Sequence, residues 1–491
     1  MKDVLGAAVA HAARYLDSLS SRPIAANASI AELRSRLSRP VPERGIDPKD
    51  VIDDLVRDTE GGLVGSASGR FFGWVIGGTL PTALAADWLT SAWDQNGASN
   101  LTAPAEAVVE EVCGTWMKHL LGIPEAASFA FVTGCQMAHT TALAAARHQL
   151  LKERGWDVER HGLSGAPRLT ILTTQSRHES ILRSSRLLGL GTDAIEYVGG
   201  ESTGRMPVEG LRRALERAKP GPTVVWLQAG DLNTGHFDPF GEACEAAHAA
   251  GAWVHIDGAF GLWVATSAKY RHLLAGAENA DSWATDGHKW LNLPFDSGQV
   301  FVAHPTAHRA AFAQDASYSI PNNELRNQKD WNPEWSRRGR GFVAYAAIRA
   351  LGRAGIAEIV ERCCTHARRL VDGIGQLPGA QMVAEPTINQ GLVRFLGADG
   401  DHNAATDDVI RRIQSDGVSW FGGATWNGMR VMRVSVCNWM TSSDDVERTL
   451  ASIAKVLEER AGGTRHGSDG SSGMSPGPSS MLNPSRLVGS A

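Results

Sequence analysis

The chain has 491 residues, of which 43% are hydrophobic and 21% are charged, values that exclude wholesale disorder and a collagen-like or highly charged polymer. This length exceeds what one hydrophobic core usually organises, so we expect several lobes and exclude a small disulfide scaffold. The formal net charge of -5 gives no basic surplus for nucleic acid or anionic lipid, so we expect neither a nucleic-acid partner nor a membrane partner.

Two amphipathic helices are predicted near the amino terminus, at Val4–Leu19 and Ile30–Leu37, because apolar residues recur there at helical spacing. The prolines of Arg39–Pro42 interrupt the pattern. Two such helices are too thin to enclose a core, so residues 1–80 are interpreted as a helical arm that packs on another lobe or subunit. The arm therefore favours dimerisation.

From about residue 81, short β-rich runs alternate with stretches of helix length, which is the pattern of a mainly parallel sheet covered by helices. The expected strands are Phe129–Val132, Leu169–Thr173, Val224–Gln228, Trp253–Ile256 and Gln299–Ala303. Residues 81–346 are assigned to this large α/β domain.

A smaller α/β domain is predicted at residues 347–462. It begins with a long helix over about Ala347–Leu370. Two strands follow at Gly391–Phe395 and Arg430–Val436, and a last helix at Ser443–Glu458. Residues 463–491 are rich in Gly, Ser and Pro and poor in apolar residues, so this tail is expected to be disordered.

Six cysteines are scattered along the chain without a Cys-x-x-Cys pair or a Cys/His cluster at zinc spacing, so we expect reduced thiols and no metal site. The segment Met1–Leu16 lacks the uninterrupted apolar core of a secretory signal. No stretch reaches the ~18 apolar residues of a membrane span. Together these features predict a cytoplasmic protein, because unpaired cysteines suit a reducing compartment.

The first segment with catalytic potential is Phe131–His139, which passes from an expected strand into a helix through Gly134. The backbone N–H groups of Gly134, Cys135 and Gln136 would form an anion cradle at the positive end of the helix dipole. A single glycine also occurs in ordinary strand-to-helix turns, so this signal is weak alone.

Three further residues follow expected strands, where open α/β folds bind ligands. His178 is placed to stack on a planar ring, although a loop histidine is more often a bystander. Asp257 either caps the next helix or pairs with a buried cation such as a pyridinium nitrogen. Lys289, beside Trp290, is either an ordinary exposed lysine or a Schiff-base lysine held out of bulk water. Their order along the chain favours a cofactor site.

These segments resemble those of the pyridoxal phosphate (PLP)-dependent amino-acid decarboxylases of the aromatic L-amino acid, histidine and glutamate group. The similarity covers about Tyr15–Leu457, and its strongest stretches are RFFGWVIGGTLPTALAADWL from Arg70, SRHESILRSSRLLGLG from Ser176, HIDGAFG from His255 and DGHKWLN from Asp286. The resemblance implies the aspartate aminotransferase type of α/β fold (fold type I), pyridoxal 5'-phosphate as cofactor, and an intertwined homodimer with its active sites at the subunit interface.

By this resemblance, Lys289 is the lysine that binds PLP covalently and Asp257 is the partner of the pyridinium nitrogen. His178 stacks on the ring and faces the substrate carboxylate. Ala259 falls where a small residue packs against the ring. The family's phosphate contacts fall on Gly134, Cys135 and His288.

Tyr318 lies in the polar stretch 314–330, which is long enough for a lid and contains Pro321. The resemblance makes it the tyrosine of a mobile catalytic loop that protonates Cα after carbon dioxide leaves. An ordinary surface loop that happens to contain a tyrosine is the alternative.

The chain departs from the family pattern at several positions. Leu232 stands where relatives often carry a hydroxyl residue, and Cys135 and Gln136 replace commoner residues of the phosphate loop. Near the expected substrate entrance, Ile76–Gly78 replaces the Pro-Thr of the animal aromatic enzymes. These departures bear on the identity of the substrate more than on the cofactor.

The resemblance implies a PLP-dependent L-amino-acid α-decarboxylase, with an aromatic or imidazole amino acid as the expected substrate and Ser336 as weak support. An acidic substrate stays open because Arg326, Arg337 and Arg338 lie close together. The rivals are a decarboxylation-dependent aldehyde synthase, against which Tyr318 argues, a PLP-dependent lyase or aminotransferase, and an inactive PLP-binding scaffold.

Overall fold

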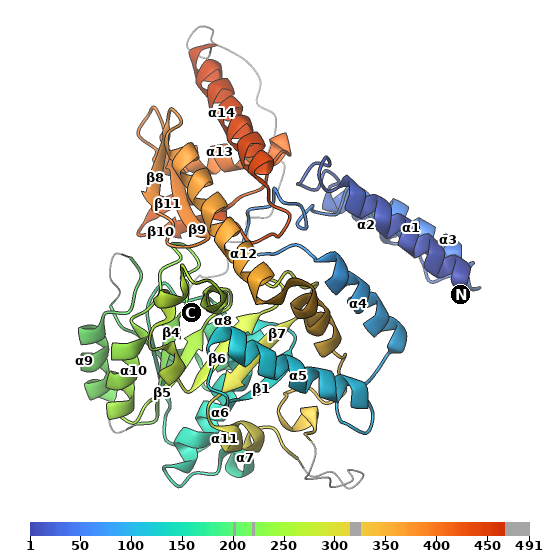
Figure 1. Cartoon of the computed structure of the whole chain (residues 1–491). Coiled ribbons are helices and arrows are strands. Elements are labelled where there is room, and N and C mark those ends of the chain that lie inside the picture. Colours follow the sequence, from blue (N-terminus) through green and yellow to red (C-terminus); the bar gives the residue numbers. More distant parts are fainter. Residues whose placement is uncertain (200–202, 219–220, 315–325, 467–491) are drawn as a thin grey trace.

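The computed structural model describes residues 1–199, 203–218, 221–314 and 326–466, and the structural statements below concern these residues. A seven-stranded sheet lies at the centre of the larger part of the molecule, in the order β1-β7-β6-β5-β4-β2-β3 (Figure 1). Its strands are β1 (Ser128–Val132), β2 (Thr170–Thr173), β3 (Ile195–Tyr197), β4 (Thr223–Gln228), β5 (Trp253–Asp257), β6 (Ser282–Asp286) and β7 (Gly298–Val302). Only β7 runs antiparallel to its neighbours, so the prediction of a mainly parallel α/β sheet is confirmed.

The strands of this sheet are apolar on both faces, as a sheet covered on both sides requires. Neighbouring residues of β4 show this, because Val224 and Val225 are both fully buried in different apolar clusters. The helices of this region are α4 (Pro81–Trp93), α5 (Pro104–Leu121), α6 (Cys135–Lys152), α7 (Val158–His161), α8 (Ser180–Leu187), α9 (Val208–Ala218), α10 (Phe240–Ala249) and α11 (Pro305–Ala310). Short 3-10 helices lie at Thr192–Ala194, Gly261–Thr266, Arg271–Leu274, Ala277–Asn279 and Gln328–Asp330.

A second, antiparallel sheet forms the small domain, with its strands in the order β10-β11-β9-β8. The elements of this domain are β8 (Ala380–Ala384), β9 (Gln390–Phe395), β10 (Gly422–Trp426) and β11 (Met429–Ser435) with α12 (Gly341–Gly375), α13 (His402–Asp416) and α14 (Ser443–His466). Helix α12 leads from the large domain to this one and is broken at Gly352, whose φ of +60° suits glycine.

The predicted division into residues 1–80, 81–346 and 347–462 remains a prediction, and the break at Gly352 lies close to its second boundary. Helix α14 continues to His466, and the expected disorder of residues 463–491 remains a prediction. Residues 467–491 lie outside the described residues.

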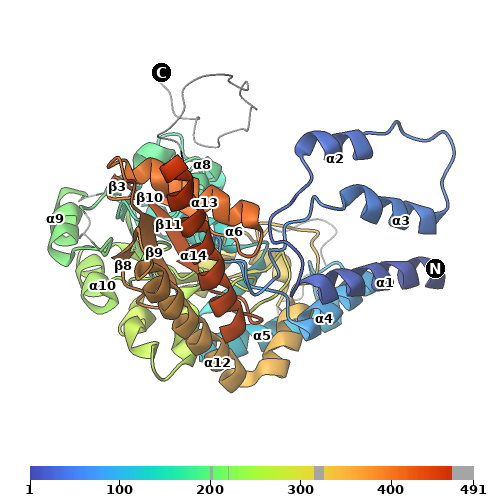
Figure 2. The ribbon, with the colours of Figure 1, turned by 90° about the horizontal axis from the view of Figure 1, so that it is seen from above.

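The amino-terminal arm contains α1 (Lys2–Ser18), α2 (Ile30–Leu37) and α3 (Pro48–Thr59). The expectation of two helices missed α3, which begins with an Asp47 cap on the Lys49 N–H and a proline in its first turn. Figures 1 and 2 show the three helices projecting away from both domains. Helix α1 has no buried residue, and within this chain Leu5 and Val9 are exposed by 59% and 48%.

No helix within the described part of the chain is long and apolar enough to cross a membrane. All six cysteines are free and buried, as the sequence analysis expected of reduced thiols.

A buried group of charges joins α5 to the start of α12. Arg337 donates two hydrogen bonds of 2.7 Å to Glu110, and Glu106 Oε1 accepts the Gly341 N–H at 2.7 Å. Glu106 Oε2 is buried without a hydrogen-bond partner among the described residues. Burial and the neighbouring Glu110 raise the pKa of Glu106 to about 8.

This raised pKa predicts a pH-dependent stability. Above the ordinary glutamate pKa of ~4.3, the unfolded chain releases the proton that folded Glu106 keeps. The free energy of unfolding therefore falls with rising pH until the folded pKa of about 8, by at most ~1.4 kcal/mol per pH unit. Glu106→Gln keeps an acceptor for the Gly341 N–H but does not titrate. Its free energy of unfolding should therefore fall less between the ordinary glutamate pKa and pH 8 than that of the unmodified protein. Urea unfolding at several pH values tests this, with Glu111→Gln on the same helix as the control; parallel curves for Glu106→Gln and the unmodified protein would contradict it.

Candidate active site

A cavity of about 430 Å³ lies at the edge of the large sheet where the parallel strands end. Residues from the loops after β1, β2, β4, β5 and β6 reach it because parallel strands all place their carboxyl ends on one edge. The sequence-predicted residues that line this cavity are Gly134, Cys135, Gln136, His178, Asp257, Ala259, His288 and Lys289. Tyr318 lies outside the described residues.

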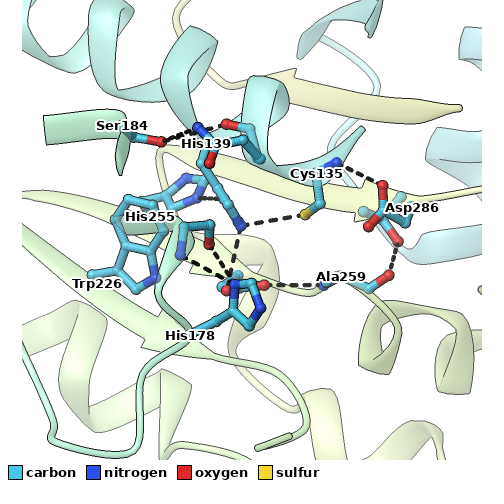
Figure 3. A network of polar contacts seen from close by, with 12 residues as sticks. Cys135, His139, His178, Ser184, Trp226, His255, Ala259 and Asp286 are labelled. Carbon is cyan, nitrogen blue, oxygen red and sulfur yellow. Dashed lines mark hydrogen bonds and ion pairs between the residues drawn. The ribbon is translucent and has the colours of Figure 1, made fainter. Parts of the chain in front are cut away.

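Asp257 is the last residue of β5, and its carboxylate is buried. Oδ1 accepts the Ala259 N–H at 3.2 Å, and Oδ2 lies 3.3 Å from His139 Nε2 (Figure 3). Burial alone would raise the pKa of Asp257, but His139, together with His178 and Lys289, lowers it below its usual range. Asp257 is therefore held as an anion at the base of the cavity.

Lys289 follows β6, and its Nζ lies 3.5 Å from Asp286 Oδ2. The ring centroid of Phe260 is 5.6 Å from the same nitrogen. Burial alone would lower the pKa of Lys289, but Asp286 and more distant negative groups raise it. Asp286 Oδ1 also accepts the Cys135 N–H at 2.6 Å, so one carboxylate links the lysine to the start of α6.

The loop that carries Lys289 is held by Asn292, which is fully buried with φ at +53°. Its side-chain oxygen accepts the Gly78 N–H at 2.7 Å and the Trp439 N–H at 2.9 Å. Its amide donates to the carbonyls of Trp290 at 2.9 Å and Cys437 at 3.2 Å. The final asparagine of DGHKWLN thus ties the lysine loop to the 70–80 segment and to the small domain.

His178 lies between β2 and α8, and its Nδ1 accepts the Ser180 N–H at 3.2 Å. The Ser180 hydroxyl lies 2.9 Å from the same nitrogen. Burial, followed by the charge of Lys289, lowers the pKa of His178. The His178 ring is therefore neutral near pH 7. Because Nδ1 accepts a hydrogen bond, the proton of the ring is on Nε2, which is free to donate.

The first turn of α6 and His288 offer polar groups to an anion. Gly134 precedes the helix without a side-chain cap, and His288 Nδ1 is buried without a hydrogen-bond partner among the described residues. The His288 ring stacks on Phe295 with centroids 4.3 Å apart. One expected phosphate donor is already engaged, because the Cys135 N–H bonds to Asp286. The remaining groups fit the phosphate of PLP.

The three arginines that kept an acidic substrate open do not line the cavity. Arg337 is paired with Glu110, and Arg338 with Asp87 at 2.7 Å. Arg326 donates to the Phe129 carbonyl and covers the Phe129 ring at 4.2 Å. Each of these cations has a structural partner within this chain.

The sequence analysis missed Arg433, which reaches the cavity from β11 of the small domain. Its guanidinium donates to the carbonyls of Trp74 at 3.1 Å and Leu232 at 2.6 Å, while its Nε is buried without a partner among the described residues. Burial lowers the pKa of Arg433 to about 10. No local pattern marks this arginine, because the fold brings it to the cavity from a distant segment.

His139 was also missed, although it follows Cys135 by one helical turn and so shares its face. Its Nε2 lies 3.3 Å from Cys135 Sγ as well as from Asp257. The Cys135–His139 spacing was visible in the sequence, but its meaning depends on Asp257, which belongs to another strand.

The pyridoxal-dependent decarboxylase conserved domain matches residues 31–396 of this chain. The chain therefore belongs to the pyridoxal-dependent decarboxylase family, whose members are carboxy-lyases that use PLP. Lys289, the anionic Asp257 and the anion-accepting turn of α6 fit the three parts of this cofactor, namely its aldehyde, its ring nitrogen and its phosphate.

Individual relatives differ in the substrate that their names give. The aromatic-L-amino-acid decarboxylase of Bacillus atrophaeus is 24% identical over 91% of this chain and 93% of its own length. An acidic amino acid decarboxylase of Bos taurus is 29% identical over 65% of this chain and 61% of its own length. The crystal structure of Oryza sativa TDC with PLP and tryptamine superimposes with a TM-score of 0.88 at 21% identity, covering 94% of this chain and 98% of that one. This likeness confirms fold type I.

Replacing Asp286 predicts a change in how the protein captures its cofactor. Asp286→Asn keeps an acceptor for the Cys135 N–H but removes the charge 3.5 Å from Lys289 Nζ. The pKa of Lys289 should then fall, because the charge that raises it most is gone, and more neutral amine is left at a given pH. Covalent PLP binding by the apoprotein should become faster near neutral pH, with its pH profile moved to lower pH, as stopped-flow absorbance measures. Asp281→Asn, at the other end of β6, is the control, and an unmoved profile in Asp286→Asn would contradict the assignment.

Proposed function

We propose that this protein decarboxylates an L-amino acid with an aromatic or imidazole side chain, releasing carbon dioxide and the amine. The composition of the cavity wall beside Lys289 carries this proposal. Its apolar and aromatic residues are Trp74, Val75, Ile76, Leu232, Phe260 and Phe295. A planar side chain would bury its faces against these groups, which favours aromatic over short polar substrates.

We assign Lys289 to covalent attachment of PLP and to its release when the substrate amine takes its place. Asp257, as a buried anion, would hold a proton on the pyridine nitrogen. When bound, PLP supplies an electron sink for the pair left at Cα as the carboxylate departs. Ala259 and His178 would lie against the ring, and His288 with the first turn of α6 would hold the phosphate.

The neutral His178 is suited to the substrate carboxylate. Its Nε2–H can donate one hydrogen bond without adding a full positive charge. A carboxylate paired with a cation would be stabilised in the ground state, which opposes its loss as neutral carbon dioxide. The return of a proton to Cα is assigned to Tyr318 on the sequence resemblance alone.

Arg433 favours an acidic amino acid as a second candidate substrate. It is a half-buried cation in the cavity wall, and its Nε is available to an acceptor. A side-chain carboxylate bound there would gain a charge-assisted hydrogen bond. Arg433 already donates to two backbone carbonyls. These contacts favour another role for this arginine, namely closing the small domain over the cavity.

Product analysis separates these candidates. The purified protein with PLP is incubated in air with aromatic, imidazole, acidic and basic L-amino acids, and the products are identified by mass spectrometry. We expect one amine, lighter than its aromatic or imidazole parent by one carbon dioxide, and no product from Lys289→Ala. An amine from an acidic amino acid that disappears in Arg433→Met would select the second candidate. An aldehyde with ammonia would instead identify an aldehyde synthase, and turnover by Lys289→Ala would refute the site.

We also propose that the chain is a cytoplasmic homodimer whose arm packs on a second copy. The arm projects from the molecule (Figure 2). It exposes apolar side chains, among them Leu5 at 59% and Leu55 at 52%. Leaving such side chains in water is unfavourable, and a second subunit would cover them. The free, buried cysteines support a reducing compartment.

The dimer proposal predicts that charges in the arm weaken association. Leu5→Asp combined with Leu55→Asp should lower the molar mass measured by size-exclusion chromatography with light scattering, most clearly on dilution. Met382→Asp on β8, also an exposed apolar position at 42%, is the control and should leave the mass unchanged. A dimer equally stable in the arm variant would show that the arm does not hold it.

A further inference from the structure

We propose that His139 is a positioning residue for Asp257, and that a buried chain through His255 and Ser282 fixes which nitrogen of His139 carries a proton. The inference rests on the proposed role of Asp257 as partner of the PLP ring nitrogen. It concerns groups behind the cavity wall, beyond the residues assigned above to the cofactor.

A continuous chain of contacts runs from the strands to the helix, and Figure 3 shows the part of it around His255 and His139. Trp253 Nε1 donates to Ser282 Oγ at 2.9 Å, and Ser282 Oγ lies 2.9 Å from His255 Nδ1. His255 Nε2 lies 3.0 Å from His139 Nδ1, and His139 Nε2 lies 3.3 Å from Asp257 Oδ2. Neighbouring strands β5 and β6 and helix α6 thus contribute to one line of hydrogen bonds.

The Asp257 end of this line sets its first donor. An ionised Asp257 can only accept, so His139 Nε2 carries the proton between them. The same direction continues along the line when His255 Nε2–H donates to His139 Nδ1 and the Ser282 O–H, which also accepts from the Trp253 indole, donates to His255 Nδ1. In this arrangement each ring nitrogen of the two histidines has one role, as donor or as acceptor. Burial, then repulsion from His139, lowers the pKa of His255 well below its usual range, which agrees with a neutral ring.

Packing leaves the rings little freedom to choose another arrangement. His139 and His255 are exposed by only 1% and 2%, and Ser282 is fully buried. The Trp226 ring lies against both imidazoles, with centroids 4.7 Å from His139 and 4.4 Å from His255. A ring flip at His139 would break its contacts with His255 and Asp257, so the donor toward Asp257 is held in place.

These contacts fix the orientation of the Asp257 carboxylate and also favour its negative charge. Ala259 N–H holds one carboxylate oxygen and His139 holds the other, so the plane of the carboxylate is set. The groups that face His139 are Asp257 and His255 from β5 and Cys135 from its own helix, with His178 and Lys289 beyond Asp257. Without His139, burial would favour a protonated Asp257, which would no longer hold a proton on the ring nitrogen.

The test compares His139→Leu with the unmodified holoenzyme. The variant loses a hydrogen bond to a buried charge. Its PLP affinity or its kcat should therefore be lower by about tenfold to a hundredfold, while KM stays nearly unchanged. PLP affinity is measured by fluorescence quenching during reloading of the apoprotein. The pH titration of the visible absorption of bound PLP should also shift, because it reports the charge around the ring, which a purely structural role would not move.

Two variants separate positioning from loss of structure. His308→Leu removes another buried histidine with a serine partner, Ser128, and should lower thermal stability without moving the PLP titration. His139→Asn retains a donor on the same helix face and should recover part of the PLP affinity. If His139→Leu does not fold, Ser282→Ala replaces it as the test and should give a smaller shift of the same sign.

A double-mutant cycle with Asp257→Asn separates the proposed function of Asp257 from the positioning role of His139. If His139 acts through Asp257, His139→Leu should add little to Asp257→Asn. An Asp257→Asn enzyme with normal PLP binding and turnover would refute the proposed function of Asp257. A damaged Asp257→Asn with an unaffected His139→Leu would refute only the present inference.

The same contacts permit a metal-binding alternative, because ligand atoms of Cys135, His139 and Asp257 lie within 4.8 Å of one another. Burial raises the pKa of the Cys135 thiol well above its usual range, which opposes the thiolate that a metal prefers. A stoichiometric metal ion in the purified protein, whose removal changed PLP affinity, would overturn the positioning role.

Discussion

The buried negative charge of Asp257 is the constraint on which the rest of the site depends. A charge taken out of water is costly unless hydrogen bonds and opposite charges compensate it. Ala259 and His139 supply the hydrogen bonds, and Lys289 lies near enough to help lower the pKa of the carboxyl group. A protonated ring nitrogen would complete this compensation, so the protein side of the site already has the electrostatic form that PLP requires.

The parallel sheet explains why groups far apart in sequence can share this charge. Asp257 and Lys289 follow neighbouring strands, β5 and β6, whose carboxyl ends lie on one edge. The loop after β6 then needs its own support, because under the proposed function Lys289 binds the cofactor from a fixed place. Asn292 gives that support with four hydrogen bonds to three separate segments, and so couples the lysine to the small domain.

The sequence predicted what local patterns encode and missed what depends on contacts between distant segments. Strand β5 and Asp257 were found because a buried apolar run ends in an acid, whereas β3 was missed because two of its three residues are exposed. Asp257 and Lys289 each follow an expected strand, which is a local signal. Their order along the chain strengthened the prediction of a cofactor site. Arg433 has none, since its partners Trp74 and Leu232 belong to other parts of the chain. The roles of the cofactor residues came from family resemblance, and the contacts around them came only from the fold.

The origin of the cavity residues suggests why cofactor chemistry and substrate choice can vary separately. Asp257 and Lys289 are held by the large sheet, where a change of one residue disturbs a buried charge. The side-chain wall comes from elsewhere: Trp74 from the segment between α3 and α4, Leu232 from a loop, and Arg433 from the small domain. Substitutions in that wall alter shape and charge near the substrate without touching the partners of Asp257. The names of the relatives give aromatic and acidic substrates, and the wall of this chain combines aromatic surface with one half-buried arginine among the described residues that line it.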